Sequence, residues 1–231
     1  MKVKVVVTDV DGTLTNMGNK LSLNAVKAVR KLEDNGIPVV LASGNALCVL
    51  KTLKHYIGCS GALVAEGGAV VEYNDKVKIL GDGREAREVL TELKKKFGSL
   101  IVESWSNSYR YVDVALKRTI EKNKLLQVLD KFPSLRLMDS GFAYHIIDKN
   151  LNKGVGLKVA AKLMNVKVEE MVTVGDSETD IEMFEITGYR IALTNAPQTL
   201  KNLADYVTKN EDGKGFVEAV ERIFLLTKNF G

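Results

Sequence analysis

Residues 3–14 have the sequence VKVVVTDVDGTL, a mostly β-branched run that leads into two aspartates, Asp9 and Asp11. An almost uninterrupted apolar run is typical of a strand buried on both faces of a parallel sheet. Side chains two apart in a strand point to the same side, so the two carboxylates should lie about 6 to 7 Å apart at its carboxyl end. Such a like-charge pair is unfavourable unless a cation or a proton is shared there.

Neither a simple turn nor a common loop motif accounts for this stretch. A turn would explain Asp11 and Gly12 through their local geometry, but it gives no reason for Asp9. An EF-hand calcium loop starting at Asp9 would need Gly and Glu where the chain has Leu14 and Lys20. A dinucleotide-binding loop is excluded because no GxGxxG follows the strand.

The chain on either side of a central block alternates strand and helix patterns. This order predicts an α/β fold with a doubly wound, Rossmann-like parallel sheet, whose sites lie at the carboxyl ends of its strands. The later strands of this sheet are predicted at 38–42, 62–65, 171–174, 189–193 and 206–208.

The central block has the mixed pattern of a small α+β layer. Its helices are predicted at 85–97 and 120–132, and its strands at 100–105, 109–116, 135–138 and 142–147. We therefore predict a core domain in two parts, 1–81 and 153–231, with an inserted α+β cap domain at 82–152.

Composition excludes several classes of protein. With 231 residues, 45% hydrophobic and 27% charged, the chain is ordinary for a globular protein. It has no apolar window of the roughly 18 to 20 residues that a membrane span needs, and no secretory signal, so a cytoplasmic location is expected. The net charge of +4 is modest and its cations are dispersed, which gives no indication of nucleic-acid binding. Cys48 and Cys59 form no metal motif and are predicted to be buried apolar residues.

A second acidic cluster, GDSETD at 175–180, follows the strand predicted at 171–174. Ser177 and Asp180 match a helix capping box, which leaves Asp176 free to face the same sheet edge as Asp9. Carboxylate oxygens at two strand ends suit Mg²⁺, which keeps open positions for a substrate phosphate.

Two further segments suit a phosphate group. Ser43 and Gly44 follow the second predicted strand at the start of its helix, where a hydroxyl and free backbone N–H groups can hold an anion. Lys153 stands at the start of a predicted helix, an unusual place for a cation unless it answers an anion.

In order and spacing, four segments resemble the motifs of haloacid-dehalogenase-superfamily phosphatases: DVDGTL at 9–14, LASGN at 41–45, NKG at 152–154 and GDSETD at 175–180. The resemblance covers essentially the whole chain. The place of the insertion is similar to that of the cap in the Cof-like and sucrose-phosphatase-like branch. Within that branch, the chain looks most like the archaeal phosphoglycolate phosphatases.

The resemblance implies a phosphoaspartyl mechanism with Mg²⁺. Asp9 would attack phosphorus, while Asp11 would protonate the leaving alcohol and then activate water. The implied metal-binding groups are Asp9, the backbone carbonyl of Asp11, Asp176 and, directly or through water, Asp180. The implied substrate-binding residues are Ser43, Gly44 and Lys153.

We therefore expect a phosphomonoesterase for a small phosphorylated metabolite, with 2-phosphoglycolate first, as a monomer or homodimer. A sugar-phosphate phosphatase or a phosphomutase stays open within the same class. A receiver-like signalling module would carry its phosphorylated Asp on a middle strand and would need no inserted domain. A non-catalytic phosphate-binding protein would be expected to have lost one of the four aspartates.

Some residues depart from the family's motifs or suggest another role. Asn45 stands where many relatives have Arg, and Thr179 where many have Asn. Asn195 follows another predicted strand, where it could face the site, but before Ala-Pro a turn residue is the preferred interpretation. His145 is expected to have a structural role in a cap strand. On the predicted cap strands, Trp105, Tyr109 and Tyr111 could close over a substrate, but packing on the cap sheet is the preferred interpretation.

Overall fold

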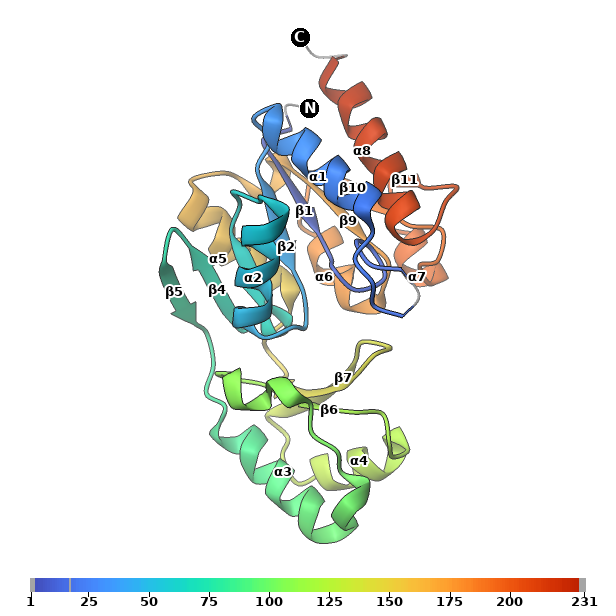
Figure 1. Ribbon diagram of the computed structural model, residues 1–231. Helices are drawn as coiled ribbons and strands as arrows, with labels where there is room; N and C mark the ends of the chain where they lie inside the picture. Colours follow the sequence, from blue (N-terminus) through green and yellow to red (C-terminus); the bar gives the residue numbers. More distant parts are fainter. Residues whose placement is uncertain (1–2, 17, 229–231) are drawn as a thin grey trace.

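The computed structural model describes residues 3–16 and 18–228. An eight-stranded sheet, in the order β11-β10-β9-β1-β2-β3-β4-β5, lies in the upper half of Figure 1. At one edge of the sheet is a hairpin, in which β4 (Val70–Tyr73) runs antiparallel to β3 and β5 (Lys76–Ile79) runs antiparallel to β4. The parallel strands are β1 (Val5–Thr8), β2 (Val39–Ala42), β3 (Leu63–Ala65), β9 (Met171–Gly175), β10 (Tyr189–Ala192) and β11 (Tyr206–Val207).

The sheet reverses its winding beside its first strand. The chain moves outward from β1 through β2 to β3, and after the cap it returns to β9 on the other side of β1. The loops that follow β1 and β9 therefore diverge and open a crevice at the carboxyl edge. The predicted doubly wound α/β fold is confirmed, and the two acidic motifs follow the two strands at this crevice.

Helices cover both faces of the sheet (Figure 1). One face is packed by α1 (Leu23–Asp34), α2 (Leu47–Ile57) and α8 (Asp212–Lys228), and the other by α5 (Lys153–Met164) and α6 (Ile181–Phe184). In β1, Val6 packs with the first set and Val5 and Val7 with the second. Full burial of such a side chain contributes about 1.5–3 kcal/mol, which explains the continuous apolar run. A short helix, α7 (Gln198–Lys201), packs on α6 and β10 through Leu200.

A smaller layer lies below the core in Figure 1, and we call residues 82–152 the cap. Its antiparallel sheet has the order β6-β8-β7, and one face packs on α3 (Arg84–Phe97) and α4 (Lys122–Leu129). Tyr144 and Ile146 point to those helices, whereas Met138 and Ile147 join the main core cluster. The strands are β6 (Val114–Leu116), β7 (Leu135–Asp139) and β8 (Tyr144–Asp148).

The chain passes between the two sheets twice, between β5 and α3 and between β8 and α5. The predicted boundaries at 82 and 152 fall in these two connections, and the division into two domains stays a prediction. The predicted core segments also include residues 1–2, 17 and 229–231, which lie outside the described residues.

The prediction of strands at 100–105 and 109–116 is wrong for most of its length. Residues Gly98–Leu100 and Trp105–Tyr109 form 3₁₀ turns. Of the two predicted segments, β6 is the strand, and Glu103 forms an isolated antiparallel bridge with its Leu116. Ser104 caps the second turn by accepting a hydrogen bond from the Ser106 N–H, and the Asn107 side chain accepts one from the Ala115 N–H. These side chains compete with a strand ladder for the backbone.

Two predictions about burial are also wrong. Trp105, Tyr109 and Tyr111 do not pack on the cap sheet but are 71%, 58% and 48% exposed. Cys48 is exposed on α2, whereas Cys59 is buried as predicted. The apolar side of α2 is formed by other residues, and Leu47 and Leu50 face the core.

Candidate active site

Asp9 lies directly after β1 at the carboxyl edge of the sheet and is only 4% exposed. Its Oδ1 accepts a hydrogen bond from Lys153 Nζ at 2.8 Å. No donor within the described ranges reaches its Oδ2. Burial raises the pKa of Asp9 well above its usual value, although Lys153 opposes this shift. The side chain thus presents one oxygen that no neighbour holds.

Lys153 is the first residue of α5 and is buried between two carboxylates. Its Nζ lies 2.8 Å from Asp9 Oδ1 and 2.7 Å from Asp180 Oδ1. The Asn152 side chain caps the helix by accepting a hydrogen bond from the Val155 N–H. Burial lowers the pKa of Lys153, but Asp180 and Asp9 outweigh it and raise the pKa overall. These carboxylates compensate for the unfavourable place of a cation at a helix N-terminus.

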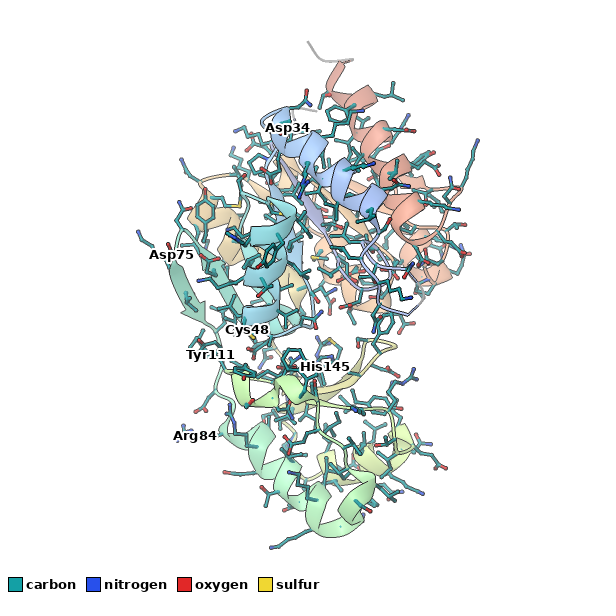
Figure 2. All side chains as sticks on the ribbon, in the orientation of Figure 1. Asp34, Cys48, Asp75, Arg84, Tyr111 and His145 are labelled. Atoms are coloured by element: carbon teal, nitrogen blue, oxygen red, sulfur yellow. The ribbon has the colours of Figure 1, made fainter. Side chains whose placement is uncertain are left out.

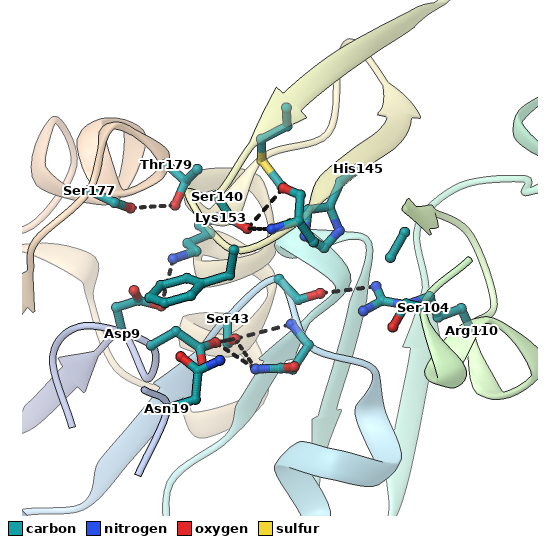
Figure 3. Close-up of a pocket in the computed structure, with 17 residues that line it drawn as sticks. Asp9, Asn19, Ser43, Ser104, Arg110, Ser140, His145, Lys153, Ser177 and Thr179 are labelled. Atoms are coloured by element: carbon teal, nitrogen blue, oxygen red, sulfur yellow. Dashed lines mark hydrogen bonds and ion pairs between the residues drawn. The ribbon is translucent and has the colours of Figure 1, made fainter. Parts of the chain in front are cut away.

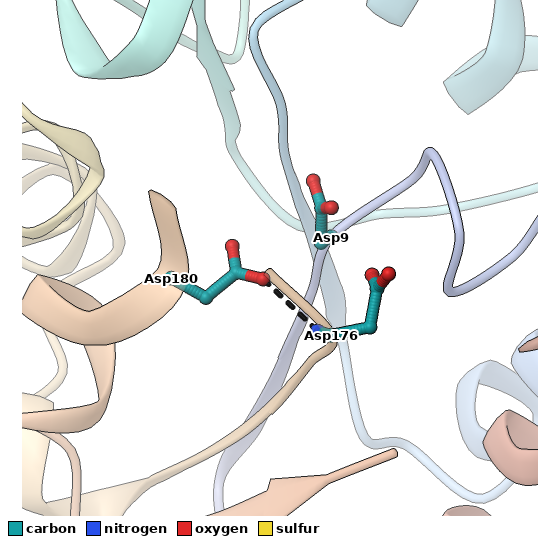
Figure 4. A group of neighbouring side chains, drawn as sticks. All are labelled: Asp9, Asp176 and Asp180. Carbon is teal, nitrogen blue, oxygen red and sulfur yellow. Dashed lines mark hydrogen bonds between the residues drawn. The ribbon is translucent and has the colours of Figure 1, made fainter. Parts of the chain in front are cut away.

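Oxygens of Asp9, Asp176 and Asp180 lie within 4.8 Å of one another (Figure 4). Thr13 Oγ1 donates to Asp176 Oδ1 at 2.6 Å, and Asp180 Oδ2 accepts from the Asp176 N–H at 3.0 Å. Burial and the nearby charge of Asp180 raise the pKa of Asp176 to about 7. One lysine does not balance three ionised carboxylates, so a bound cation would favour the ionised forms of Asp9 and Asp176.

Asp11 has its side chain turned away from this cluster. Its Oδ2 accepts hydrogen bonds from Asn45 Nδ2 at 2.7 Å and from Ser43 Oγ at 3.4 Å. Burial raises the pKa of Asp11, and Lys153 opposes this shift. Its backbone carbonyl accepts no hydrogen bond from the described residues. The departure at Asn45 from the family motif therefore supplies a hydrogen bond to Asp11.

Ser43 and Gly44 follow β2 but do not begin its helix, because α2 starts at Leu47. The prediction that placed them at the helix start is wrong. Ser43 Oγ instead accepts hydrogen bonds from the backbone N–H and the Nδ2 of Asn45, each at 3.0 Å. The Gly44 N–H has no acceptor within the described part of the chain.

A divalent cation with oxygen ligands fits the acidic cluster. The cluster offers three carboxylates, and hard oxygen ligands of this kind suit Mg²⁺. Within this set Asp180 is the most engaged, because Lys153 bonds its Oδ1 and the N–H groups of Asp176 and Ser177 bond its Oδ2. It can therefore position its neighbours as well as bind a cation.

Two residues with other predicted roles lie at the site. Asn195 lies in a turn as predicted, but it also belongs to the site, because its Nδ2 donates to Asp176 Oδ2 at 3.1 Å and to the Gly12 carbonyl at 3.3 Å. The signal was present, since Asn195 follows a strand as Asp9 and Asp176 do. His145 reaches the site from the cap, so its role is not only that of a strand residue.

A cavity of about 120 Å³ lies between the core and the cap (Figure 3). The core contributes Asp9, Asp11, Ser43, Gly44 and Lys153, so all five predicted catalytic and substrate-binding residues line it. The cap contributes Ser104, Arg110, Ala115, Met138, Ser140, Phe142, Ala143 and His145.

The chain matches the family model described as haloacid dehalogenase-like hydrolase over residues 6–127 and 117–220. It is 37% identical to the phosphoglycolate phosphatase of Methanothermobacter thermautotrophicus, over 95% of this chain and 98% of that protein. It is 38% identical to the protein of the same name from Archaeoglobus fulgidus, over 97% and 99%. The chain therefore belongs to the haloacid dehalogenase-like hydrolases, and the resemblance found in the sequence is confirmed.

Solved structures agree on the fold. The crystal structure of Thermoplasma acidophilum 0175 has a TM-score of 0.89 at 22% identity, and the match covers 97% of this chain and 100% of that one. A haloacid dehalogenase-like hydrolase from Bacteroides thetaiotaomicron has a TM-score of 0.81 at 20% identity, over 96% and 100%. Within the described ranges, no helix is long and apolar enough to cross a membrane.

Proposed function

We propose that the protein is a Mg²⁺-dependent phosphomonoesterase that works through a phosphoaspartyl intermediate and prefers 2-phosphoglycolate. The observation that carries this proposal is the state of Asp9. Its Oδ1 is held by Lys153, its Oδ2 is bonded by no described residue, and it lines a small cavity. A fixed carboxylate with one unengaged oxygen is suited to nucleophilic attack.

In the first step, Asp9 Oδ2 attacks phosphorus and the bond from phosphorus to the ester oxygen breaks. The electron pair leaves on that oxygen, which takes a proton from Asp11. The raised pKa of Asp11, caused by its burial, supports a protonated acid at this stage. Lys153 Nζ and the free Gly44 N–H are available to the phosphoryl oxygens.

In the second step, Asp11 takes a proton from a water molecule, and the water oxygen attacks phosphorus. The bond from phosphorus to Asp9 breaks and returns the carboxylate together with inorganic phosphate. Asn45 and Ser43 hold the Asp11 carboxylate during this step through their hydrogen bonds to its Oδ2.

The residues that would hold Mg²⁺ are Asp9, Asp176, Asp180 and the free carbonyl of Asp11. When bound, the ion supplies positive charge that lets an anionic ester approach these carboxylates. The three carboxylates gathered around one lysine support this assignment.

The substrate assignment is supported by size and by relatives. The cavity of about 120 Å³ is smaller than the roughly 150 Å³ that holds one benzene molecule, so the site favours the smallest phosphate esters. A hexose phosphate is too large for it while the cap is in this position. The relatives named phosphoglycolate phosphatase match nearly the whole chain.

The test is phosphate release from 2-phosphoglycolate, hexose phosphates and p-nitrophenyl phosphate, with Mg²⁺ or with EDTA. We expect Mg²⁺-dependent turnover with the highest kcat/KM for 2-phosphoglycolate, and its loss in Asp9→Asn. A matched control is Asp34→Asn, which changes an exposed acid at the end of α1, at the top of Figure 2. No turnover on any ester would refute the proposal, and a preference for hexose phosphates would refute its substrate.

A further inference from the structure

Three cap residues form a buried charged group beside the cavity. The side chains of Arg110, Asp113 and His145 are 3%, 0% and 5% exposed. Asp113 lies between the other two, with its Oδ1 2.6 Å from Arg110 Nη1 and its Oδ2 2.7 Å from His145 Nδ1. Arg110 and His145 line the cavity, at the end opposite Asp9 in Figure 3.

Each of these two residues keeps one nitrogen without a partner. The Nη1 of Arg110 also donates to the Gly44 carbonyl at 2.9 Å, and its Nε donates to Ser106 Oγ at 3.1 Å. Among the described residues, Arg110 Nη2 and His145 Nε2 have no hydrogen-bond partner. Among the described residues the only buried side-chain nitrogen or oxygen without a partner is Arg136 Nε, so Arg110 Nη2 and His145 Nε2 are accessible atoms. Since both side chains line the cavity, these two nitrogens are available to a ligand there.

The rest of the cap wall offers little to a polar ligand. Its hydroxyl groups are already engaged, because Ser104 Oγ bonds Ser106 Oγ and Ser140 Oγ donates to the Ala143 carbonyl. The remaining lining is apolar: Ala115, Met138, Phe142 and Ala143. The polar end of a leaving group would therefore meet Arg110 and His145.

Charge balance favours an anion. Burial raises the pKa of Asp113, but Arg110 and His145 outweigh it and hold the pKa below its usual value, so Asp113 is ionised and neutralises Arg110. His145 Nε2 donates to a ligand when the ring carries a proton on both nitrogens, and the group of three then has one net positive charge. One carboxylate on a ligand would neutralise that charge, whereas an amine would be repelled.

We propose that Arg110 Nη2 and His145 Nε2 form a carboxylate-binding subsite that selects phosphate esters of short 2-hydroxy acids. The phosphoryl group would lie at Asp9 and Lys153, and the carboxylate at the cap. Asp113 is a positioning residue that orients both donors. This inference rests on the proposed phosphatase function and adds the residues that set its substrate.

The experiment compares 2-phosphoglycolate with 2-hydroxyethyl phosphate, which has a hydroxymethyl group in place of the carboxylate. The variants are His145→Gln and Arg110→Lys, with Arg84→Gln as a control on an exposed cap arginine. We expect His145→Gln to lower kcat/KM for 2-phosphoglycolate by about 10- to 100-fold, mainly through KM. Activity on 2-hydroxyethyl phosphate should change by less than about threefold, since no charged contact is lost there.

An equal loss of kcat/KM for both esters would overturn the proposal, because it would show that Arg110 and His145 only hold the cap in place. Unchanged activity in His145→Gln and Arg110→Lys would also overturn it. Thermal unfolding of each variant checks that it is folded. If Arg110→Lys does not fold, the kcat/KM values of His145→Gln for the two esters still test the proposal.

Binding separates this inference from the proposed function. Calorimetric titration of Asp9→Asn, with Mg²⁺ present, measures the affinity for both esters without turnover. A tighter Kd for 2-phosphoglycolate that is lost in Asp9→Asn/His145→Gln supports the subsite, even if the wild type hydrolyses neither ester. Equal affinities for both esters would refute the subsite without refuting the phosphatase activity.

Discussion

At the scale of single residues, Lys153 controls the acidic cluster, because its ammonium group joins Asp9 and Asp180. We predict that Lys153→Met lowers kcat by about 100- to 1000-fold, the usual cost of removing one group that stabilises developing charge. Removing one partner of a buried ion pair also lowers the free energy of unfolding by about 3–5 kcal/mol. Phosphate release and urea unfolding measure the two effects.

The same variant tests the metal site. Since Lys153→Met leaves three carboxylates without their lysine, Mg²⁺ should raise its Tm more than it raises that of the wild type. Lys158→Met is the control, because Lys158 is an exposed lysine of the same helix. If Mg²⁺ raises the Tm of Lys153→Met and of the wild type by the same amount, the result would argue against a cation bound by these carboxylates.

Asp113 gives a prediction about pH. Arg110 and His145 outweigh its burial and hold its folded-state pKa below the ordinary 3.8. The unfolded chain therefore takes up this proton at higher pH than the folded one, so stability from the ionised group is complete above about pH 4 and is lost as pH falls through the folded pKa. Asp113→Asn should lower the free energy of unfolding by about 3 kcal/mol or more at pH 7.

The difference between wild type and Asp113→Asn should narrow below about pH 4, as measured by urea unfolding from about pH 7 to about pH 2.5. Asp130→Asn, an exposed acid of the cap, should show almost no difference at any pH. A gap that stays constant down to the lowest pH would mean that the carboxylate charge of Asp113 is not what stabilises the cap.

At the scale of elements, the sequence predicts those whose burial is set by a simple pattern. The apolar run of β1 is buried on both faces, so its type follows from its composition. The segment 98–113 could not be predicted in this way, because hydrogen bonds of Ser104 and Asn107 decide its backbone. Similarly, Asp113 and His145 meet only when two segments of the cap come together, so neither local sequence indicates the pair.

The turn at η1 (Glu66–Gly68) positions α5 and therefore Lys153. Gly68 has φ +101°, and a Cβ there would lie 1.9 Å from the Asn152 carbonyl oxygen and 2.9 Å from the Lys153 nitrogen. We predict that Gly68→Ala lowers the free energy of unfolding by about 3 kcal/mol or more and also lowers kcat, because the start of α5 must move.

The matched control for Gly68 is Gly36→Ala, where φ is +72° and the space around the added Cβ is open. It carries only the backbone cost, about 1–2 kcal/mol, and should leave kcat unchanged. Urea unfolding and steady-state assays compare the two variants. If Gly68→Ala and Gly36→Ala lose the same free energy of unfolding and have the same kcat, the contact between Gly68 and the start of α5 affects neither stability nor activity.

At the scale of the whole molecule, the cap is held against the core by two sets of hydrogen bonds. The buried carboxylate of Glu66, in the core, accepts from the N–H groups of Tyr111, Val112 and Asp113 in the cap, the Val112 bond being 2.9 Å long. Arg110 donates in the opposite direction, to the Gly44 carbonyl. Arg110 and Gly44 line the cavity, and Glu66 holds the three residues that follow Arg110, so the position of the cap determines how large a ligand can enter.

Removing the Glu66 carboxylate should therefore widen the range of substrates. In Glu66→Ala three cap N–H groups lose their acceptor, a cost of about 1–3 kcal/mol, which favours an open cap. We predict that kcat/KM for a hexose phosphate relative to 2-phosphoglycolate rises about tenfold, together with a larger radius of gyration in X-ray scattering. In Glu66→Gln, which keeps one acceptor oxygen, this kcat/KM ratio should lie between those of Glu66→Ala and the wild type. In the control Glu88→Ala, at an exposed position of α3, the ratio should equal that of the wild type. If the ratio stays unchanged while the radius grows, the limit on substrate size must lie in the core rather than in the closure of the cap.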